Sequence, residues 1–173
     1  WSKISPNKRN TDSIERAHGD GIKVSLESPE AFEEVFWKTF EDTETESYAK
    51  FRHYVHRIAT RYNKNRYLSK NNQNIRRLEL ISEIFPNSKI LIPFRDPIQH
   101  ANSLLTQHKK FIEDSKKDNF IFNYMNWIGH TEFGPNYIPI NSQNLVHQND
   151  LHINHWLEQW YLTYQECLEK FSG

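Results

Sequence analysis

The sequence has only one cysteine, Cys167, and no apolar run approaches the roughly 20 residues that cross a bilayer. A single cysteine excludes an internal disulfide and fits a reducing compartment, so the cytoplasm is the expected location. Gly-x-Gly-x-x-Gly turns and Gly-x-Ser-x-Gly elbows are also absent. The chain therefore lacks the signatures of dinucleotide binding and of acyl transfer through an elbow serine.

Metal and nucleic-acid sites have little support in the sequence. His53 and His56 are three residues apart, as are His152 and His155, but neither pair belongs to a His-Glu-x-x-His motif. We therefore expect no metal. The rings between residues 120 and 130 recur at helical spacing, which favours core packing over base stacking. No nucleic-acid partner is expected.

Charge is balanced overall but sorted along the chain. Residues 27–46 contain eight acids and one base, whereas residues 50–77 contain nine bases and no acid. Two interpretations are open. The two segments could form helices that pair through their opposite charges, or the basic segment could line an anionic ligand.

The apolar pattern predicts an α/β protein with one domain over residues 1–173. Short strands are expected at 66–70 and 89–93, with a further strand within 22–26 of an otherwise irregular 1–27 region. Strand, helix, strand and helix in succession indicate a parallel sheet flanked by helices, with ligands beyond the carboxyl ends of its strands. The expected helices are 29–41, 48–62, 75–85, 97 to about 111, 120–130, and 149 to about 171, with a charged break at 114–119.

The segment 89–103 has the pattern of a phosphate site. Its apolar strand would be buried on both faces and would end at Arg95, after which Asp96 can cap a helix that starts with Pro97. A guanidinium beside a helix amino end, with the Ser103 hydroxyl two turns later, offers several donors to a phosphate. The alternative is an ordinary corner in which Arg95 pairs with Asp96 or with an acid on another helix. Lys70, at the end of the preceding strand, would share the same sheet edge.

Three further residues are candidates for proton transfer or for packing. His18 and Asp20 lie in Glu15-Arg-Ala-His-Gly-Asp-Gly21, which is either a glycine-hinged turn or a loop whose side chains take a proton from a substrate. His108 follows Ser103 on the same expected helix. A histidine in that position is more often packed or solvated than chemically active.

Arg95-Asp-Pro-Ile-Gln-His-Ala-Asn-Ser103 resembles the 3'-phosphate-binding motif of sulfotransferases. Tyr67-Leu-Ser-Lys70-Asn-Asn and Phe85-Pro-Asn-Ser-Lys89 are similar to the family's lysine-ended strand and to the turn before its arginine strand. The similarity is closest over residues 66–111. The family's phosphate-binding loop, of the Pro-(Lys/Arg)-Ser-Gly-Thr-Thr type, does not occur in residues 1–173. We therefore expect a fragment of a longer chain, which by itself would hold only half of the donor site.

The resemblance implies a P-loop-NTPase-like fold and sulfuryl transfer from 3'-phosphoadenosine 5'-phosphosulfate to a hydroxyl or amine of a small molecule, glycan or peptide. Arg95 and Ser103 would hold the 3'-phosphate of the donor, and Lys70 would stabilise charge near the reacting group. His18 or Asp20 would be the base. Two alternatives are a noncatalytic module that binds a nucleotide or phosphate, and a relative of nucleotide kinases, although the spacing from Arg95 to Ser103 favours the sulfonate donor.

Overall fold

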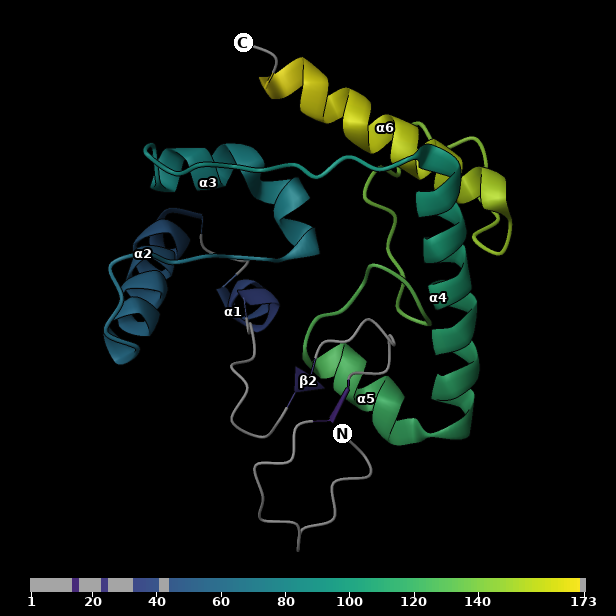
Figure 1. Ribbon diagram of the computed structural model, residues 1–173, viewed down its shortest axis with the longest axis horizontal. Helices are drawn as coiled ribbons and strands as arrows, with labels where there is room; N and C mark the ends of the chain where they lie inside the picture. Colours follow the sequence, from purple (N-terminus) through teal and green to yellow (C-terminus); the bar gives the residue numbers. More distant parts are fainter. Residues whose placement is uncertain (1–13, 16–22, 25–32, 41–43, 172–173) are drawn as a thin grey trace, which may run out of the picture.

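The computed structural model describes residues 14–15, 23–24, 33–40 and 44–171 (Figure 1). This part of the chain is rich in helix. Its strands are two-residue segments, β1 and β2, which pair antiparallel, and β2 lies within the strand expected at 22–26. The elements are β1 (Ile14–Glu15), β2 (Lys23–Val24), α1 (Glu33–Phe40), α2 (Glu44–Arg61), the 3₁₀ helix η1 (Asn72–Arg77), α3 (Leu78–Ile84), α4 (Pro97–Lys117), α5 (Asn119–Trp127) and α6 (Ile153–Phe171).

Aromatic side chains form the core where α1, α2 and α3 meet. Phe36 and Trp37 of α1 pack on Phe51 of α2, with ring centroids 5.4 and 4.5 Å from the Phe51 ring. Ile84 of α3 closes this cluster and is only 2% exposed. The helical stripes in the sequence therefore face one another, as their spacing predicts.

A second core lies where α4 crosses α6. Ala101 is fully buried, and its small side chain allows α4 to approach Trp156 of α6 closely. The Trp156 indole N–H donates to the backbone carbonyl of Asp150 at 2.8 Å, so the ring is buried without an unpaired donor. Phe133, from the loop after α5, completes the buried cluster.

Polar contacts join the part of the chain built from α1, α2, η1 and α3 to the part that contains α4 and α6. Helices α2 and α4 stand on opposite sides of Figure 1. The Arg76 guanidinium in η1 donates to three successive backbone carbonyls, those of Ile138, Pro139 and Ile140, at 2.9 to 3.3 Å. The Gln73 side chain adds a hydrogen bond to the hydroxyl of Thr131 at 3.0 Å. No helix in the described ranges is both long and apolar enough to cross a membrane.

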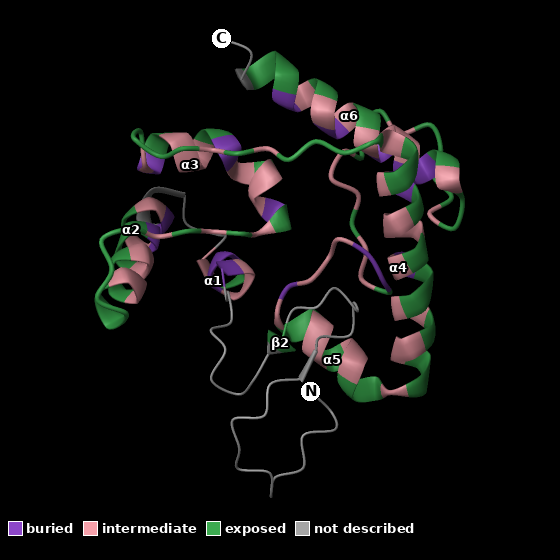
Figure 2. Ribbon diagram, in the orientation of Figure 1, coloured by how far each residue is buried: buried purple, intermediate pink, exposed green. Residues whose placement is uncertain are grey.

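The expected strands at 66–70 and 89–93 are not strands in the structure. Both segments are irregular, and the parallel sheet is not confirmed. Leu91 is 89% exposed, so the second segment is not buried on both faces as predicted, and its trace is mostly green in Figure 2. The physical reason is that a strand needs a neighbour for its backbone hydrogen bonds, and no described segment pairs with either one. Figure 1 shows that the chain runs in the same direction along both.

Helix ends agree with local signals in some places and not in others. The Asn71 side chain caps the next helix by accepting from the Gln73 amide at 3.0 Å, although the first turns of that helix are 3₁₀ rather than α-helical. Helix α4 continues to Lys117, so the expected end near Phe111 is wrong. Lysines in its last turn suit the helix dipole, and the break is confined to Asp118, which caps α5.

Candidate functional site

The corner at Arg95 is built as the sequence predicts on its helix side. The Asp96 carboxylate accepts from the Gln99 amide at 2.9 Å, and Pro97 occupies the first turn of α4. Asp96 is therefore used as the cap and is not an ion-pair partner of Arg95. The amino end of α4, with its partial positive charge, lies directly beside Arg95.

Helix α6 contacts the residues just before Arg95, which the sequence did not reveal. The Tyr164 hydroxyl donates to the backbone carbonyl of Pro93 at 2.6 Å. The Phe94 ring contacts Trp160 and Tyr164 edge-on, with centroids 5.3 and 5.4 Å apart. Burial raises the pKa of Tyr164, so its hydroxyl stays protonated and remains a donor at neutral pH. The sequence predicts a helix here but gives no sign that Trp160 and Tyr164 would contact the corner.

The Arg95 side chain is exposed and forms no ion pair with an acid in the described part of the chain. The pairing alternative thus has no partner among those acids. Burial lowers the pKa of His100, and the positive charge of Arg95 lowers it further. Ser103, which is half-buried, follows His100 by three residues on α4. Because residues three apart on a helix are neighbours, His100 and Ser103 line one stretch of its surface. His100 was not singled out from the sequence, although its spacing to Ser103 is helical.

The remaining predicted site residues do not join this group through direct contacts. Lys70 is exposed, and its ammonium donates to the Asn72 side chain at 3.2 Å. No hydrogen bond in the described ranges links it to Arg95 or Ser103. His18 and Asp20 lie outside the described residues.

Within the described residues, the acidic and basic segments form an ion pair between Glu34 and Arg77. The Glu34 carboxylate accepts two hydrogen bonds from the Arg77 guanidinium, at 2.5 and 2.8 Å, which confirms charge pairing between the two segments here. The same guanidinium lies over the Trp37 ring at 5.1 Å. Arg57, Arg61 and other bases of this segment are exposed on α2 and beyond it.

A buried carboxylate next to that ion pair was missed in the sequence. Glu33 is 1% exposed and accepts hydrogen bonds from the hydroxyls of Tyr67 and Ser69. Burial, followed by the hydrogen bond to Glu33, raises the pKa of Tyr67, which therefore remains a donor at any physiological pH. A single acid in a run of acids gives no sign of such burial. The hydroxyls of Tyr67 and Ser69, two residues apart, are the sequence signal that could have indicated donors for a buried acid.

Two buried histidines occupy the seam between α4 and α6. His108, 1% exposed, accepts from the Gly134 amide through Nδ1 at 3.0 Å, so its proton sits on Nε2, 3.6 Å from an Asp150 oxygen. His155 donates its Nδ1–H to the His147 carbonyl at 2.7 Å, because a carbonyl oxygen can only accept a hydrogen bond, and its Nε2 accepts from the Tyr137 hydroxyl at 2.7 Å. These contacts fix both rings, and the packed interpretation of His108 is confirmed.

Because His108 is buried, we expect the stability of the protein to fall in acid. Burial lowers the pKa of His108 below its ordinary value, so below about pH 6.5 the unfolded chain takes up a proton that the folded chain resists. The free energy of unfolding should therefore fall from pH 7 to pH 5, by at most about 1.4 kcal/mol per pH unit for one histidine. Urea unfolding across this range checks it, with His53→Gln on the exposed face of α2 for comparison. An unchanged pH slope in His108→Gln would contradict the assignment.

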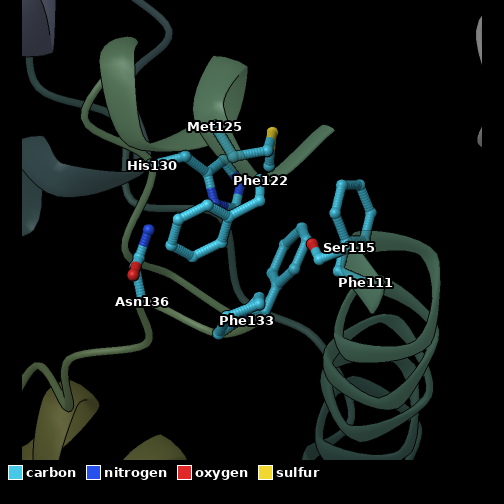
Figure 3. Close-up of a pocket in the computed structure, with 8 residues that line it drawn as sticks. Phe111, Ser115, Phe122, Met125, His130, Phe133 and Asn136 are labelled. Atoms are coloured by element: carbon cyan, nitrogen blue, oxygen red, sulfur yellow. The ribbon is translucent and has the colours of Figure 1, made fainter. Parts of the chain in front are cut away.

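A small apolar pocket lies near the carboxyl end of α4, where Phe122, Met125 and Phe133 gather (Figure 3). Its interior has room for about one water molecule. Phe111 on its wall is 14 residues from Pro97, or about 21 Å along the helix. The pocket is therefore separate from the Arg95 corner. Within the described ranges, no group of three or more potential metal ligands gathers.

The corner thus places an exposed arginine directly before a helix amino end, a combination whose positive charge can attract an anion. A family model described as "Sulfotransferase family" matches residues 3–127. Because this match spans well over half of the chain, the chain belongs to the sulfotransferase family. The matched region extends on both sides of residues 66–111, where the sequence resemblance is closest. Comparisons with curated proteins and with solved structures gave no match.

Proposed function

We propose that this protein transfers a sulfuryl group from 3'-phosphoadenosine 5'-phosphosulfate to a hydroxyl or amine. The observation that supports this most directly is the exposed Arg95 at the capped start of α4, inside the region that matches the family. When bound, the donor supplies the sulfuryl group: the acceptor oxygen or nitrogen bonds to sulfur as the bond from sulfur to the 5'-phosphate oxygen breaks, releasing adenosine 3',5'-bisphosphate.

The residues near the corner have the chemistry that such a donor requires. Arg95 is open to an anion, the α4 amino end adds its partial positive charge, and the Ser103 hydroxyl offers a further donor. We assign these groups to the 3'-phosphate. Lys70 is assigned to the leaving 5'-phosphate, where its ammonium stabilises developing charge. The acceptor's proton is assigned to His18 or Asp20, in the region 16–22.

The fold that we propose for the complete site is a parallel, P-loop-like sheet within one domain. Segments 66–70 and 89–93 run in the same direction and are separated in the chain by η1 and α3, as a strand, helix and strand unit requires (Figure 1). Helices packed on the face of such a sheet would cover Leu68 and Leu91, which are 91% and 89% exposed. Their exposure supports this proposal.

Calorimetric titration with adenosine 3',5'-bisphosphate tests the donor site. The protein should bind it, and Arg95→Ala should weaken binding about 30-fold to 100-fold, because a charge-assisted contact to phosphate is lost. Arg57→Ala, on the exposed surface of α2, is the matched control for a lost positive charge.

Two results would contradict the proposal in different ways. Failure of the unchanged protein to bind the bisphosphate would reject the donor site. Binding that depends on Arg95 but is unaffected by Ser103→Ala would retain the site and reject the role of Ser103. A noncatalytic phosphate-binding module is the second candidate, and the exposed Arg95 supports it equally. It is favoured if the bisphosphate binds but no labelled sulfuryl group leaves the donor.

A further inference from the structure

The segment that carries Lys70 turns alternate side chains to opposite sides. Tyr67, Ser69 and Asn71 point toward α1 and donate hydrogen bonds to its glutamates. Leu68 and Lys70 are exposed, Leu68 by 91%. Such alternation is the property of an extended backbone, in which neighbouring side chains point to opposite faces. The groups that hold 67, 69 and 71 therefore determine where Lys70 projects.

Glu33 is the main holder of this segment. One oxygen of its carboxylate accepts from the Tyr67 hydroxyl, and the other accepts from the Ser69 hydroxyl at 2.8 Å, with the Asn71 amide 3.5 Å away. The carboxylate is 1% exposed. A buried charge is stable only while its oxygens are hydrogen-bonded. Movement of the segment would uncover that charge, so the segment is held in one place.

Glu34, the next residue, is joined mainly to a different part of the chain and shares only the Asn71 contact with the Lys70 segment. It accepts two hydrogen bonds from Arg77 at the end of η1, together with one from the Asn71 amide at 2.6 Å. The two adjacent carboxylates thus bind different partners. Glu34 fastens η1 through an ion pair, whereas Glu33 fastens only neutral side chains that flank Lys70.

We propose that Glu33 is a positioning residue that orients Lys70 toward the leaving 5'-phosphate of the donor. It acts through the hydroxyls of Tyr67 and Ser69 and does not itself touch the donor. This inference rests on the proposed function, because the bound donor is the anion that Lys70 would meet. The exposed Lys70 ammonium has only the Asn72 side chain as a described hydrogen-bond acceptor, so it is available for such a contact.

A double-mutant cycle in adenosine 3',5'-bisphosphate binding separates positioning from general stability. Lys70→Ala should weaken binding about tenfold, as loss of one phosphate contact does. Glu33→Gln should weaken it by a similar factor, and the double variant should be no weaker than Lys70→Ala alone. Glu34→Gln is the matched control, and it should lower thermal stability with a smaller effect on binding. Tyr67→Phe provides a milder change if Glu33→Gln does not fold.

Trypsin cleavage gives a second readout that needs no donor. In Glu33→Gln, the bond after Lys70 should be cut several-fold faster than in the unchanged protein, because the segment opens locally. The bond after Lys64, outside the held segment, should be cut at an unchanged rate. Equal acceleration at both bonds would indicate general unfolding and would overturn the proposal.

The binding outcomes distinguish this inference from the proposed function. If the unchanged protein does not bind the bisphosphate, the proposed function fails, and the role of Glu33 in orienting Lys70 toward the donor fails with it. If it binds and Lys70→Ala weakens binding while folded Glu33→Gln does not, the role of Glu33 is rejected and the function stands. Additive effects in the double variant would likewise reject it.

Discussion

Replacement of Trp156 by alanine should cost about 3 to 5 kcal/mol of the free energy of unfolding. The indole is 2% exposed, packs against Tyr137 and His108 with ring centroids 4.8 and 5.2 Å away, and donates to the Asp150 carbonyl. Its removal leaves a cavity between α4 and α6 and an unpaired acceptor. Urea unfolding followed by circular dichroism measures the loss, which for a chain of this size lowers the melting temperature by roughly 6 to 20 °C.

Trp127→Ala is the control, because that ring is 60% exposed on α5. It should cost at most about 1 kcal/mol. Trp156→Phe retains most of the packing and extends the test if the alanine variant is too unstable to study. Equal losses for Trp127→Ala and Trp156→Ala would show that the seam between α4 and α6 is not the main core of this half.

The second large effect is expected at the ion pair between α1 and η1. Arg77→Met should destabilise the protein by about 2 to 4 kcal/mol, because it leaves the Glu34 carboxylate mostly buried with only the Asn71 amide as a described donor. The side chains of Arg77 and Glu34 are 16% and 15% exposed, so water compensates only in part. Thermal unfolding and urea titration of the variant give the value.

Arg57→Met, on the exposed surface of α2, removes the same charge and should change stability by about 0.5 kcal/mol or less. Adding Glu34→Met to Arg77→Met should recover part of the loss, since the unpaired buried charge is then gone. If Arg77→Met were no more costly than Arg57→Met, the ion pair would contribute nothing to stability.

Local chemistry was the part of the fold that the sequence predicted well. Asp96 and Pro97 at the start of α4, and Asn71 before η1, act within three residues of themselves, so their roles follow from the neighbouring sequence. The segments 66–70 and 89–93 failed as strands for the opposite reason. A strand depends on hydrogen bonds to a distant partner, and apolar residues alone do not supply one.

In the candidate site, too, the sequence predicted local features and missed contacts between distant residues. Arg95 and Ser103 were identified through a local sequence motif; in the structure Arg95 directly precedes the Asp96 cap of α4, and Ser103 lies within that helix. The support from Tyr164 could not be predicted, because its hydroxyl meets the Pro93 carbonyl 71 residues away in sequence. Glu33 likewise meets Tyr67 and Ser69 at separations of 34 and 36 residues. Contacts across such separations depend on packing that no local pattern specifies.

The contact of α6 with the Arg95 corner bears on how this protein can be shortened. The family match ends at residue 127, whereas Trp160 and Tyr164 belong to a helix that begins at Ile153. A shortened version limited to the matched residues would keep the motif and lose the helix that braces its backbone. It would also leave Ala101 and its neighbours on α4 open to water. Boundaries drawn from family similarity alone would therefore uncover the apolar face of α4, whereas a version that keeps α6 retains its packing partner.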